Sequence, residues 1–569
     1  MIITRSFLKT TPQLCEGGEG IIFEKDGGLI KIYKSHINLI EKKTKLESLL
    51  KLSVPKQVVK PTELCYDENN KFIGFFMRKV IDGIELKQLS NKKTIKSLSI
   101  TIKDILRVLV QVKDVLKTLH KLGIYVGDLN DCNILFDKNF DVHFIDCDSW
   151  SIGGVNCNVC MDSFKDPFLK SDNFNEKTDS YAFSIMSFKS LTKIHPFGGT
   201  TNPDMDLLQR MNKKISVIDN QNVTIPRTIP SWNFIPPRLL QQMKEIFENG
   251  KRELLTDNLD DYNNNLILCK KDTEYYYSKF TTCPYCDVTA KILDKPVKID
   301  ATGGPQPILF FTSEDIQFIL SLDSYVNKKG EIVHNVINGR TVVNTFGTKV
   351  YFVNKDCYVE DKGTELIIKY NNSVNTLKKK YKTDVKVENG FVYFISNSDQ
   401  LMKVQPLPGG NGIETISKCS SNSIFDYSGG SYFICSNYSH MKVIQIDGNY
   451  YQMDNNTDKI VNYGIHRDAA TGYWLFIYET DKNVFKTFVF NKNELKFSND
   501  LIRYTCSLKD MCFSNATIFA PTDGFIKGFS YQKNAYKDFE CSVVTTDSTL
   551  IRDKNRFLII NEKAIYTFG

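Results

Sequence analysis

The C-terminal half of the chain carries an apolar segment that returns about every 40 residues. Successive segments are 42, 42, 39, 43, 43 and 40 residues apart, counted at Phe310, Phe352, Phe394, Phe433, Phe476, Phe519 and Ile559. Most are followed by a polar turn and a second strand-like segment. Such a period is typical of β-propeller blades, because each small sheet must bury its apolar face against the next. The repeat predicts an all-β domain over residues 291–569 with six or seven blades.

The last repeat indicates how such a ring would close. The final pair of strand-like segments, Phe557 to Phe568, has room for only half a blade. We expect strands from about 291 to 306 to complete that blade. The alternative is a pair of β-sandwiches in which the spacing arises by chance.

Length and composition exclude several classes of protein. A chain of 569 residues is too long for one ordinary core, and 41% hydrophobic with 24% charged residues is typical of a soluble globular protein. Arg5 and Lys9 flank too short an apolar stretch for a signal peptide, and no run is long enough to span a bilayer. We expect a cytoplasmic protein without membrane contact. Its 15 cysteines are expected to be reduced, as Cys65, Cys435 and Cys541 in apolar segments suggest.

The net charge of +7 is spread over interspersed lysines and aspartates. This pattern disfavours a nucleic-acid partner. The densest basic run, Lys378-Lys379-Lys380, is interpreted as a solvated loop.

Residues 1–266 alternate strand-like and helix-like periods, which predicts an α+β domain. Apolar side chains recur at three and four residues from Ile105 to Leu119 and predict an amphipathic helix. Gly123 is the expected C-terminal stop.

Two polar blocks follow that helix, each flanked by strand-like segments. The first runs Gly127-Asp128-Leu129-Asn130-Asp131-Cys132-Asn133, and the second contains Asp146. Carboxylate and amide oxygens are the donors that Mg²⁺ prefers. The spacing predicts Asp128 as a catalytic base or hydroxyl-orienting group, with Asn133 and Asp146 as magnesium ligands for phosphoryl transfer from ATP. The alternative is that they are ordinary turn residues.

A glycine-rich turn and a lysine precede these blocks in the order that phosphoryl transfer requires. Gly17, Gly18 and Gly20 would let backbone N–H groups approach the ATP phosphates, and Lys31 would pair with the α and β phosphates. Glu47, in the helix expected between Ser35 and Leu52, is the candidate carboxylate for holding Lys31, with an exposed helical face as its alternative. The remaining predicted nucleotide-binding residues are Ile22, Leu29 and Met77.

These motifs resemble the eukaryotic-like Ser/Thr protein kinase superfamily, and more narrowly a bacterial family with a Gly-Asp-Leu-Asn catalytic loop, an Asp-x-Asp-Ser metal loop and a Cys-Pro-x-Cys tail. The resemblance covers residues 1–266 and implies a bilobal kinase domain, with an N-lobe of about 1–82 and a C-lobe of about 83–266. It also implies that Asp179 begins the buried helix that anchors the catalytic loop. Related kinases are often encoded beside a PP2C-like phosphatase and a von Willebrand factor A-type protein, in stress-response or phage-defence settings.

Three departures from the kinase pattern bear on the substrate. Val126-Gly127 replaces His-Arg before the catalytic Asp, and Asn130 replaces the lysine that neutralises the transferred phosphoryl group. The Ala-Pro-Glu element reads Asp166-Pro167-Phe168, so its glutamate is missing. Arg252, the usual partner of that glutamate, is then left to solvent or to another acid such as Asp166.

Residues 267–290 form a cysteine-containing linker. Cys283 and Cys286 have the two-residue spacing of a zinc knuckle, and Cys269 is a candidate third ligand, but the fourth is not evident. A redox pair is the other interpretation.

The sequence thus favours an ATP- and Mg²⁺-dependent Ser/Thr protein kinase whose C-terminal domain recruits a protein substrate or regulatory partner. A pseudokinase scaffold that binds ATP, or a small-molecule kinase of the same fold, are the alternatives.

Overall fold

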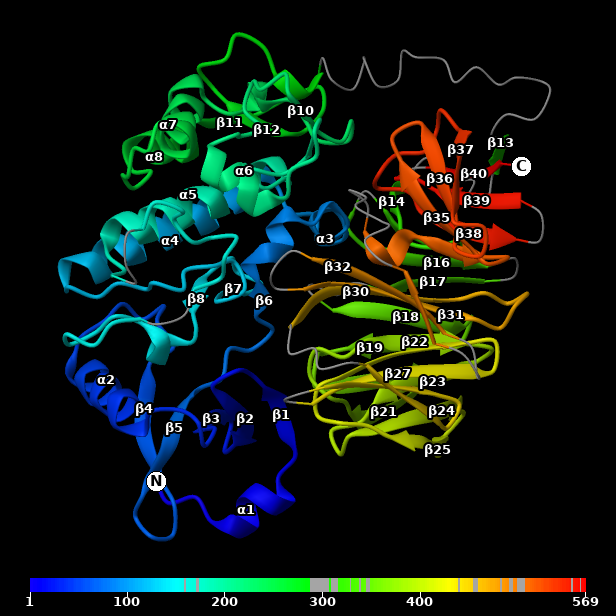
Figure 1. The fold of residues 1–569 in the computed structure, drawn as a ribbon, viewed down its shortest axis with the longest axis horizontal. Helices are drawn as coiled ribbons and strands as arrows, with labels where there is room; N and C mark the ends of the chain where they lie inside the picture. Colours follow the sequence, from blue (N-terminus) through cyan, green and yellow to red (C-terminus); the bar gives the residue numbers. More distant parts are fainter. Residues whose placement is uncertain are drawn as a thin grey trace. The chain divides into compact units, whose positions relative to one another are not determined.

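The computed structural model of the chain combines a mixed helix and strand region with an all-β region (Figure 1). It describes residues 1–157, 160–169, 173–286, 306–308, 316–327, 329–336, 339–343, 348–438, 441–453, 459–480, 484–490, 495–498, 507–553, 556–562 and 564–568. The chain forms two compact units. The first comprises Met1–Ile2, Asp26–Ile30 and Ser35–Val297, and the second comprises Ile3–Lys25, Lys31–Lys34 and Lys298–Gly569.

A five-stranded sheet with strand order β1-β2-β3-β5-β4 comes first along the chain, and its β1–β2 and β4–β5 pairs are antiparallel. Its strands and the helices among them are α1 (Arg5–Thr10), β1 (Gln13–Glu16), β2 (Gly20–Lys25), β3 (Gly28–Tyr33), α2 (Leu39–Lys51), β4 (Pro61–Tyr66) and β5 (Phe72–Arg78). Asn38 begins α2 by accepting a hydrogen bond from the Glu41 backbone N–H.

A mainly helical part follows and contains the largest hydrophobic core. Its elements are β6 (Ile84–Glu85), η1 (Leu86–Ser90), α3 (Lys92–Ser97), α4 (Ile102–Lys121), β7 (Ile134–Phe136), β8 (Val142–Phe144), η2 (Cys147–Ser149), α5 (Glu176–Thr192), β9 (Thr200–Thr201), α6 (Leu207–Lys213), β10 (Val223–Thr224), η3 (Trp232–Phe234), α7 (Pro237–Glu248), α8 (Asp257–Asn264), β11 (Leu266–Leu268) and β12 (Tyr275–Tyr277).

Helix α4 is the amphipathic helix that the apolar period predicts. It begins with a capping box between Thr101 and Asp104, and its predicted apolar face is buried. Gly123 lies just beyond its end with φ +69, and its N–H donates to the His120 carbonyl. This left-handed conformation favours glycine, so the predicted stop is confirmed.

The described residues from 306 to 568 form seven four-stranded antiparallel sheets. Their strands are β13 (Gln306–Ile308), β14 (Ile316–Ile319), β15 (Ser324–Asn327), β16 (Ile332–Val336), β17 (Gly339–Val343), β18 (Lys349–Asn354), β19 (Cys357–Asp361), β20 (Glu365–Tyr370), β21 (Ser373–Lys378), β22 (Val385–Glu388), β23 (Phe391–Ile395), β24 (Gln400–Leu407), β25 (Gly410–Lys418), β26 (Ser423–Ser428), β27 (Ser431–Asn437), β28 (Lys442–Ile446), β29 (Asn449–Met453), β30 (Ile460–Arg467), β31 (Trp474–Thr480), β32 (Phe485–Phe490), β33 (Leu495–Ser498), β34 (Cys512–Ser514), β35 (Thr517–Thr522), β36 (Phe525–Ser530), β37 (Ala535–Glu540), β38 (Thr549–Asp553), β39 (Arg556–Ile560) and β40 (Ile565–Phe568).

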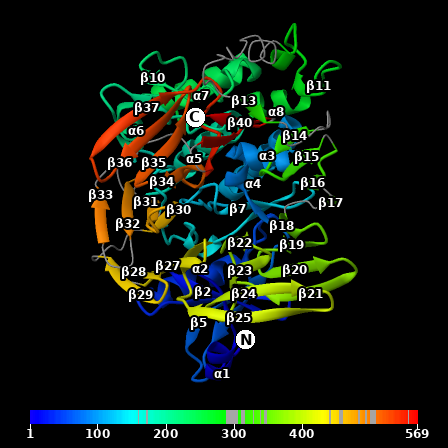
Figure 2. The same ribbon diagram turned by 90° about the vertical axis from the view of Figure 1, so that its right-hand side faces the viewer.

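Successive sheets neighbour one another. From β18 to β34, the first strand of each sheet lies beside the first strand of the next, and Figure 2 shows the β18–β21 sheet next to the β22–β25 sheet. The earliest strand of the region, β13, pairs with the last, β40, in the register Ile308 to Ile565. A strand from the start of the region thus completes the last sheet, although residues 291–305 lie outside the described ones.

The repeat positions fall on two kinds of strand. Phe394, Phe433, Phe476 and Phe519 lie in the second strand of their sheets, whereas Phe352 lies in the first strand, β18. Ile559 lies in β39, between β38 and β40 of the last sheet. Phe310 lies outside the described residues. The period therefore follows the sheets, but its phase differs at Phe352.

The interpretation of Lys378-Lys379-Lys380 as a solvated loop is wrong, because Lys378 ends strand β21 and the other two residues are buried. Lys379 and Lys380 are each 2% exposed, whereas the Lys378 side chain is 64% exposed. The Lys379 Nζ lies 3.5 Å from Asp361 Oδ2, and the Lys380 Nζ lies 2.9 Å from Asp399 Oδ1. Pairing with these carboxylates offsets the cost of burying the two ammonium groups.

The predicted core cysteines Cys65, Cys435 and Cys541 are buried and carry free thiols. Among the helices that the structure describes, none combines the length and the apolar character needed to cross a membrane.

Candidate functional site

The loop that carries Asp128 lies between α4 and β7, and Asp179 holds its backbone by hydrogen bonds. Asp179 lies in the first turn of α5 and is completely buried. Its carboxylate accepts hydrogen bonds from the backbone N–H groups of Val126 and Gly127, both at 2.9 Å, and lies 3.0 Å from His120 Nε2. The anchoring contact expected of Asp179 is therefore present, since two backbone N–H groups just before Asp128 donate to its carboxylate and the His120 side chain contacts it from α4.

Gly127 cannot be replaced here without strain. Its φ is +71, and an added Cβ would lie 2.6 Å from the Cβ of Cys157. The loop therefore needs glycine for both its backbone conformation and its close approach to residue 157.

Both carboxylate oxygens of Asp128 accept hydrogen bonds. The Met161 N–H donates to Oδ1 at 2.9 Å, Asn130 Nδ2 to Oδ1 at 3.0 Å and Asn133 Nδ2 to Oδ2 at 3.1 Å. These donors fix the orientation of the carboxylate, because two of them come from its own loop and the third from residue 161.

The two asparagines of the loop have different roles. Asn130 is 2% exposed, and its Oδ1 accepts from the N–H groups of Cys132 and Asn133, so it shapes the turn. Asn133 donates from Nδ2 to both the carboxylate and the carbonyl of Asp128, each at 3.1 Å. This directs its Oδ1, the atom that can bind a metal, away from Asp128.

Asp146 follows β8 and begins the short helix η2. Its backbone is left-handed, with φ 60 and ψ 35, and its carbonyl accepts from the Ser149 N–H at 3.2 Å and from Ser149 Oγ at 2.8 Å. Residues other than glycine rarely adopt the left-handed conformation, and those that do are enriched at functional sites. Ser149 of the Asp-x-Asp-Ser motif thus stabilises the turn that presents Asp146.

Burial raises the pKa of Asp128 to about 6, although hydrogen bonds from Met161, Asn130 and Asn133 lower it. The negative charge of Asp146 raises it further. Asp128 and Asp146 are therefore close enough to repel, and a cation between them would relieve this repulsion. The predicted residues Asp128, Asn133 and Asp146 are thus brought together.

The buried face of α2 carries lysines. Lys42 Nζ lies 3.5 Å from Asp148 Oδ2 and donates to the Asp148 carbonyl at 3.1 Å, and Lys45 Nζ donates to the Asn156 carbonyl at 2.6 Å. The Lys42 and Asp148 side chains are 8% and 0% exposed. The sequence did not predict the contact between Lys42 and Asp148. The position of Asp148 as the second aspartate of the Asp-x-Asp-Ser motif was the only sequence feature that pointed to it.

Glu47 lies on the other side of α2. Its side chain is 48% exposed, and its Oε1 is 3.6 Å from Lys43 Nζ, one turn earlier. The structure therefore places Glu47 on the exposed face of the helix, which is its alternative interpretation, and not on the buried face that a partner of Lys31 would require.

The glycine turn and Lys31 belong to the second compact unit. The Gly17 N–H donates to the Gly20 carbonyl at 2.8 Å, and a Cβ on Gly20 would lie 2.7 Å from the Ile32 carbonyl oxygen. Lys31 in β3 is 6% exposed, and its Nζ is 3.8 Å from Glu19 Oε2. Gly20 is thus needed for close packing of the turn on β3, and Gly18 is exposed.

The other predicted nucleotide-binding residues lie on three strands of the first sheet. Ile22 is in β2, Leu29 in β3 and Met77 in β5, and all three side chains are partly exposed.

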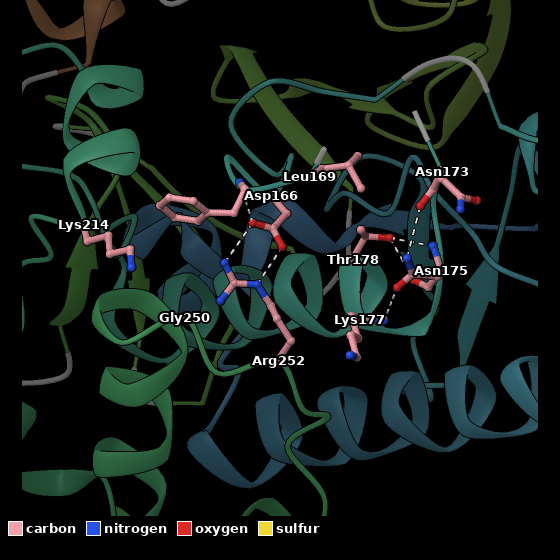
Figure 3. A pocket seen from close by; sticks show the side chains of 10 residues that line it. Asp166, Leu169, Asn173, Asn175, Lys177, Thr178, Lys214, Gly250 and Arg252 are labelled. Carbon is pink, nitrogen blue, oxygen red and sulfur yellow. Dashed lines mark hydrogen bonds and ion pairs between the residues drawn. The ribbon is translucent and has the colours of Figure 1, made fainter. Parts of the chain in front are cut away.

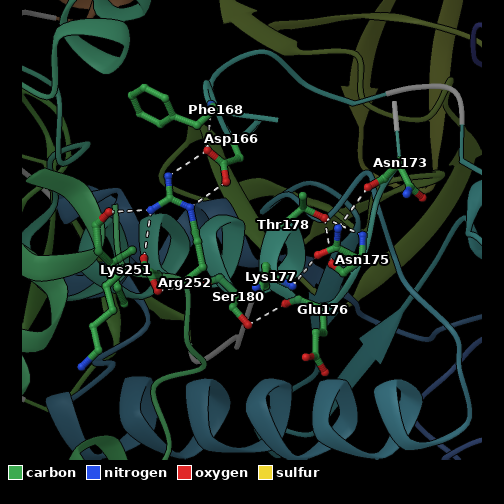
Figure 4. A network of polar contacts seen from close by, with 12 residues as sticks. Asp166, Phe168, Asn173, Asn175, Glu176, Lys177, Thr178, Ser180, Lys251 and Arg252 are labelled. Carbon is green, nitrogen blue, oxygen red and sulfur yellow. Dashed lines mark hydrogen bonds and ion pairs between the residues drawn. The ribbon is translucent and has the colours of Figure 1, made fainter. Parts of the chain in front are cut away.

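Asp166 and Arg252 form a bidentate ion pair. Arg252 Nε donates to Asp166 Oδ2 at 2.6 Å and Nη2 to Oδ1 at 2.8 Å, while Nη1 donates to the carbonyls of Ile246 and Lys251 (Figure 4). The Arg252 guanidinium also lies 4.4 Å from the centre of the Tyr181 ring. Arg252 is therefore paired with Asp166, which was one of the two outcomes expected for Arg252.

A pocket of about 500 Å³ lies beside this ion pair. Figure 3 shows Asp166 and Arg252 at one side and Asn173, Asn175 and Thr178 at the start of α5 at the other.

The three cysteines predicted as zinc ligands lie together, and Asp272 joins them. One ligand atom from each of Cys269, Asp272, Cys283 and Cys286 lies within 4.8 Å of the others. The missed residue, Asp272, follows Cys269 at the same spacing at which Cys286 follows Cys283. Because carboxylates also bind zinc, this repeated two-residue spacing could have identified Asp272 as the fourth ligand candidate.

Neither the known protein families nor the curated proteins give a match for this chain.

Proposed function

We propose that the chain is an ATP- and Mg²⁺-dependent phosphotransferase with a protein-kinase fold in residues 1–266, and that it acts on Ser or Thr hydroxyls of a protein. The observation that carries this proposal is the pair of anchors on the catalytic loop. Asp179 holds the backbone before Asp128, and Asn133 holds its carboxylate. Groups fixed in this way favour a positioned reaction, since phosphoryl transfer depends mainly on orientation and electrostatics.

The residues present fit a magnesium ion. Asn133 offers an amide oxygen and Asp146 a carboxylate, both hard donors, and the charge of Asp146 raises the pKa of Asp128. Asn133 and Asp146 would hold Mg²⁺, which supplies charge neutralisation at the β and γ phosphates. Lys31 would pair with the α and β phosphates.

Asp128 would orient the acceptor hydroxyl and take its proton. In the ionised form it accepts hydrogen bonds only, so a hydroxyl can donate to it. Asn130 supports the turn and brings no positive charge to the transferred group, so we expect slower transfer than in kinases with a lysine at this position.

A second candidate function is an ATP-binding scaffold without transfer. It is favoured by the three hydrogen bonds that already engage the Asp128 carboxylate. In that case Asp128 would be a structural residue of the loop.

For the all-β region we propose a seven-bladed β-propeller that binds a protein partner or substrate. Support comes from the seven four-stranded sheets of the described residues, the adjacency of their first strands, and the pairing of β13 with β40. Pairing of the earliest strand with the last is a common way of joining the ends of such a ring.

The test is incubation of the purified full chain with γ-labelled Mg-ATP, alone, with a generic protein substrate and with small hydroxylated acceptors. Label on Ser or Thr supports the proposal, and label on small acceptors alone would replace it with a small-molecule kinase. Asp128→Asn and Asp146→Asn should each lower transfer at least about 100-fold, whereas Asp114→Asn, at a 62% exposed position of α4, should not. ATP binding without turnover would support the scaffold function. Absence of ATP binding would exclude both the phosphotransferase and the scaffold.

A further inference from the structure

We propose that Cys269, Asp272, Cys283 and Cys286 bind one structural zinc ion, with Asp272 as the fourth ligand. Cys269 Sγ and Cys286 Sγ are 3.6 Å apart, and Asp272 Oδ2 is 3.2 Å from Cys283 Sγ and 2.9 Å from Cys286 Sγ. Zn–S bonds of about 2.3 Å in a tetrahedron give S···S separations of about 3.8 Å. The four atoms thus need only small shifts to surround one zinc ion. The site is separate from the proposed phosphoryl transfer.

The first two ligands lie on the turn between β11 and β12. The Lys271 N–H approaches Cys269 Sγ at 3.4 Å, and the Glu274 N–H donates to Asp272 Oδ1 at 3.0 Å. The Cys269 N–H in turn donates to the Glu274 carbonyl. The backbone therefore holds Oδ1 and leaves Oδ2 directed at the thiols. Such hydrogen bonds orient metal ligands before the metal binds.

The other two ligands lie on the Cys283-Pro284-Tyr285-Cys286 turn. Tyr285 stacks on Phe234 with ring centroids 5.8 Å apart, which fixes this turn against the helical core. The hairpin joins the same core, because Tyr277 packs edge-on against Tyr262. Both halves of the site are thus positioned by aromatic contacts.

The ligand chemistry selects zinc. Three thiolates exclude hard cations such as Mg²⁺ and Ca²⁺, and zinc accepts a carboxylate beside thiolates in tetrahedral sites. With four protein ligands no position stays open, so the site is structural and not catalytic. Without metal, Cys283 and Cys286 donate their protons to Asp272. Binding one Zn²⁺ to three thiols and the Asp272 carboxylate forms four bonds and releases three protons.

The ion would stabilise a segment that has little core of its own. Strands β11 and β12 have three residues each, and an isolated two-stranded hairpin is marginal in water. The zinc ion would link the β11–β12 hairpin to the Cys283–Cys286 turn, and both segments pack on the helical core.

Metal analysis of the purified full chain should find about one zinc per chain. Removal by a chelator should lower the melting temperature, and stoichiometric Zn²⁺ should restore it. Cys283→Ser should lose the ion, while Cys419→Ser, at a partly buried cysteine outside the cluster, should keep it. Iron in place of zinc, or a chain that stays metal-free after incubation with Zn²⁺, would overturn the proposal.

Two further variants test Asp272 without removing a cysteine. Asp272→Ala should lower the affinity for Zn²⁺ at least about tenfold, and Asp272→Cys should still bind the ion. Co²⁺ added to the metal-free chain should give the visible bands of a tetrahedral thiolate site, with a shift towards four-sulfur ligation in Asp272→Cys. Equal zinc affinity for Asp272→Ala and the wild type would exclude Asp272 as a ligand. Retention of zinc in Cys283→Ser would exclude the site altogether.

Discussion

Lys42 and Asp148 form a buried ion pair that joins helix α2 to the loop of Asp146. Their side chains are 8% and 0% exposed, and the Lys42 ammonium contacts both the carboxylate and the carbonyl of Asp148. Because Asp148 is two residues from Asp146, this contact can set the position of a proposed magnesium ligand. Lys42 is thus a positioning residue in the proposed function.

Lys42→Met should destabilise the protein by about 3 to 5 kcal/mol, because it leaves the Asp148 carboxylate in a buried site with one cation fewer. Chemical denaturation followed by circular dichroism measures this change. Lys43→Met is the matched control on the same helix. Its ammonium is 40% exposed, so we expect less than about 1 kcal/mol. An equally small effect of Lys42→Met would show that the pair contributes little.

Glu47→Gln should leave both stability and phosphoryl transfer nearly unchanged. Glu47 is half-exposed and contacts Lys43, and such pairs within one helix contribute about 0.3 to 0.5 kcal/mol. Denaturation midpoints and initial rates at saturating Mg-ATP test this. A tenfold loss of transfer would mean that Glu47 moves to Lys31 when nucleotide binds.

The proposed transfer should depend on pH through Asp128, whose pKa burial raises to about 6. As the ionised carboxylate is the active form, kcat/KM should rise with pH up to about 6 and then level off. The pKa of Asp128 in the folded protein lies above the ordinary aspartate value of 3.8, so the folded protein holds this proton more tightly than the unfolded chain. The contribution of Asp128 to stability is therefore present below about pH 4 and is lost as pH rises through about 6. Asp128→Asn should remove that part of the stability profile, and a kcat/KM that is flat across this range would contradict the assignment.

Local patterns could be predicted from the sequence because they follow from backbone geometry. The apolar period of α4 gives the helix, and the left-handed Gly123 gives its end. Asp128 and Asn133 lie in one loop, so their contact follows from a spacing of five residues. The repeat near 40 residues likewise reports the sheets of the all-β region.

Contacts between distant residues could not be predicted in this way. Lys42 and Asp148 are 106 positions apart, and lysines on α2 resemble a solvated face in the sequence. Lys379 and Lys380 also resemble a solvated segment in the sequence, but in the fold they are paired with Asp361 and Asp399. In each case a distant carboxylate offsets the burial of the cation, and no local period encodes its position.

Asp166→Ala should destabilise the protein by about 3 to 5 kcal/mol, because it removes the bidentate partner of a mostly buried guanidinium. The Asp166 and Arg252 side chains are 7% and 11% exposed, with hydrogen bonds of 2.6 and 2.8 Å. Asp162→Ala, at an exposed position four residues earlier, is the control and should change stability by less than about 0.5 kcal/mol. Asp166→Glu restores the charge and should recover part of the loss, as the longer side chain must shift to reach Arg252. Unfolding by urea measures all three variants. If Asp166→Ala unfolds at the wild-type midpoint, the carbonyl contacts and Tyr181 hold the Arg252 guanidinium in place without Asp166.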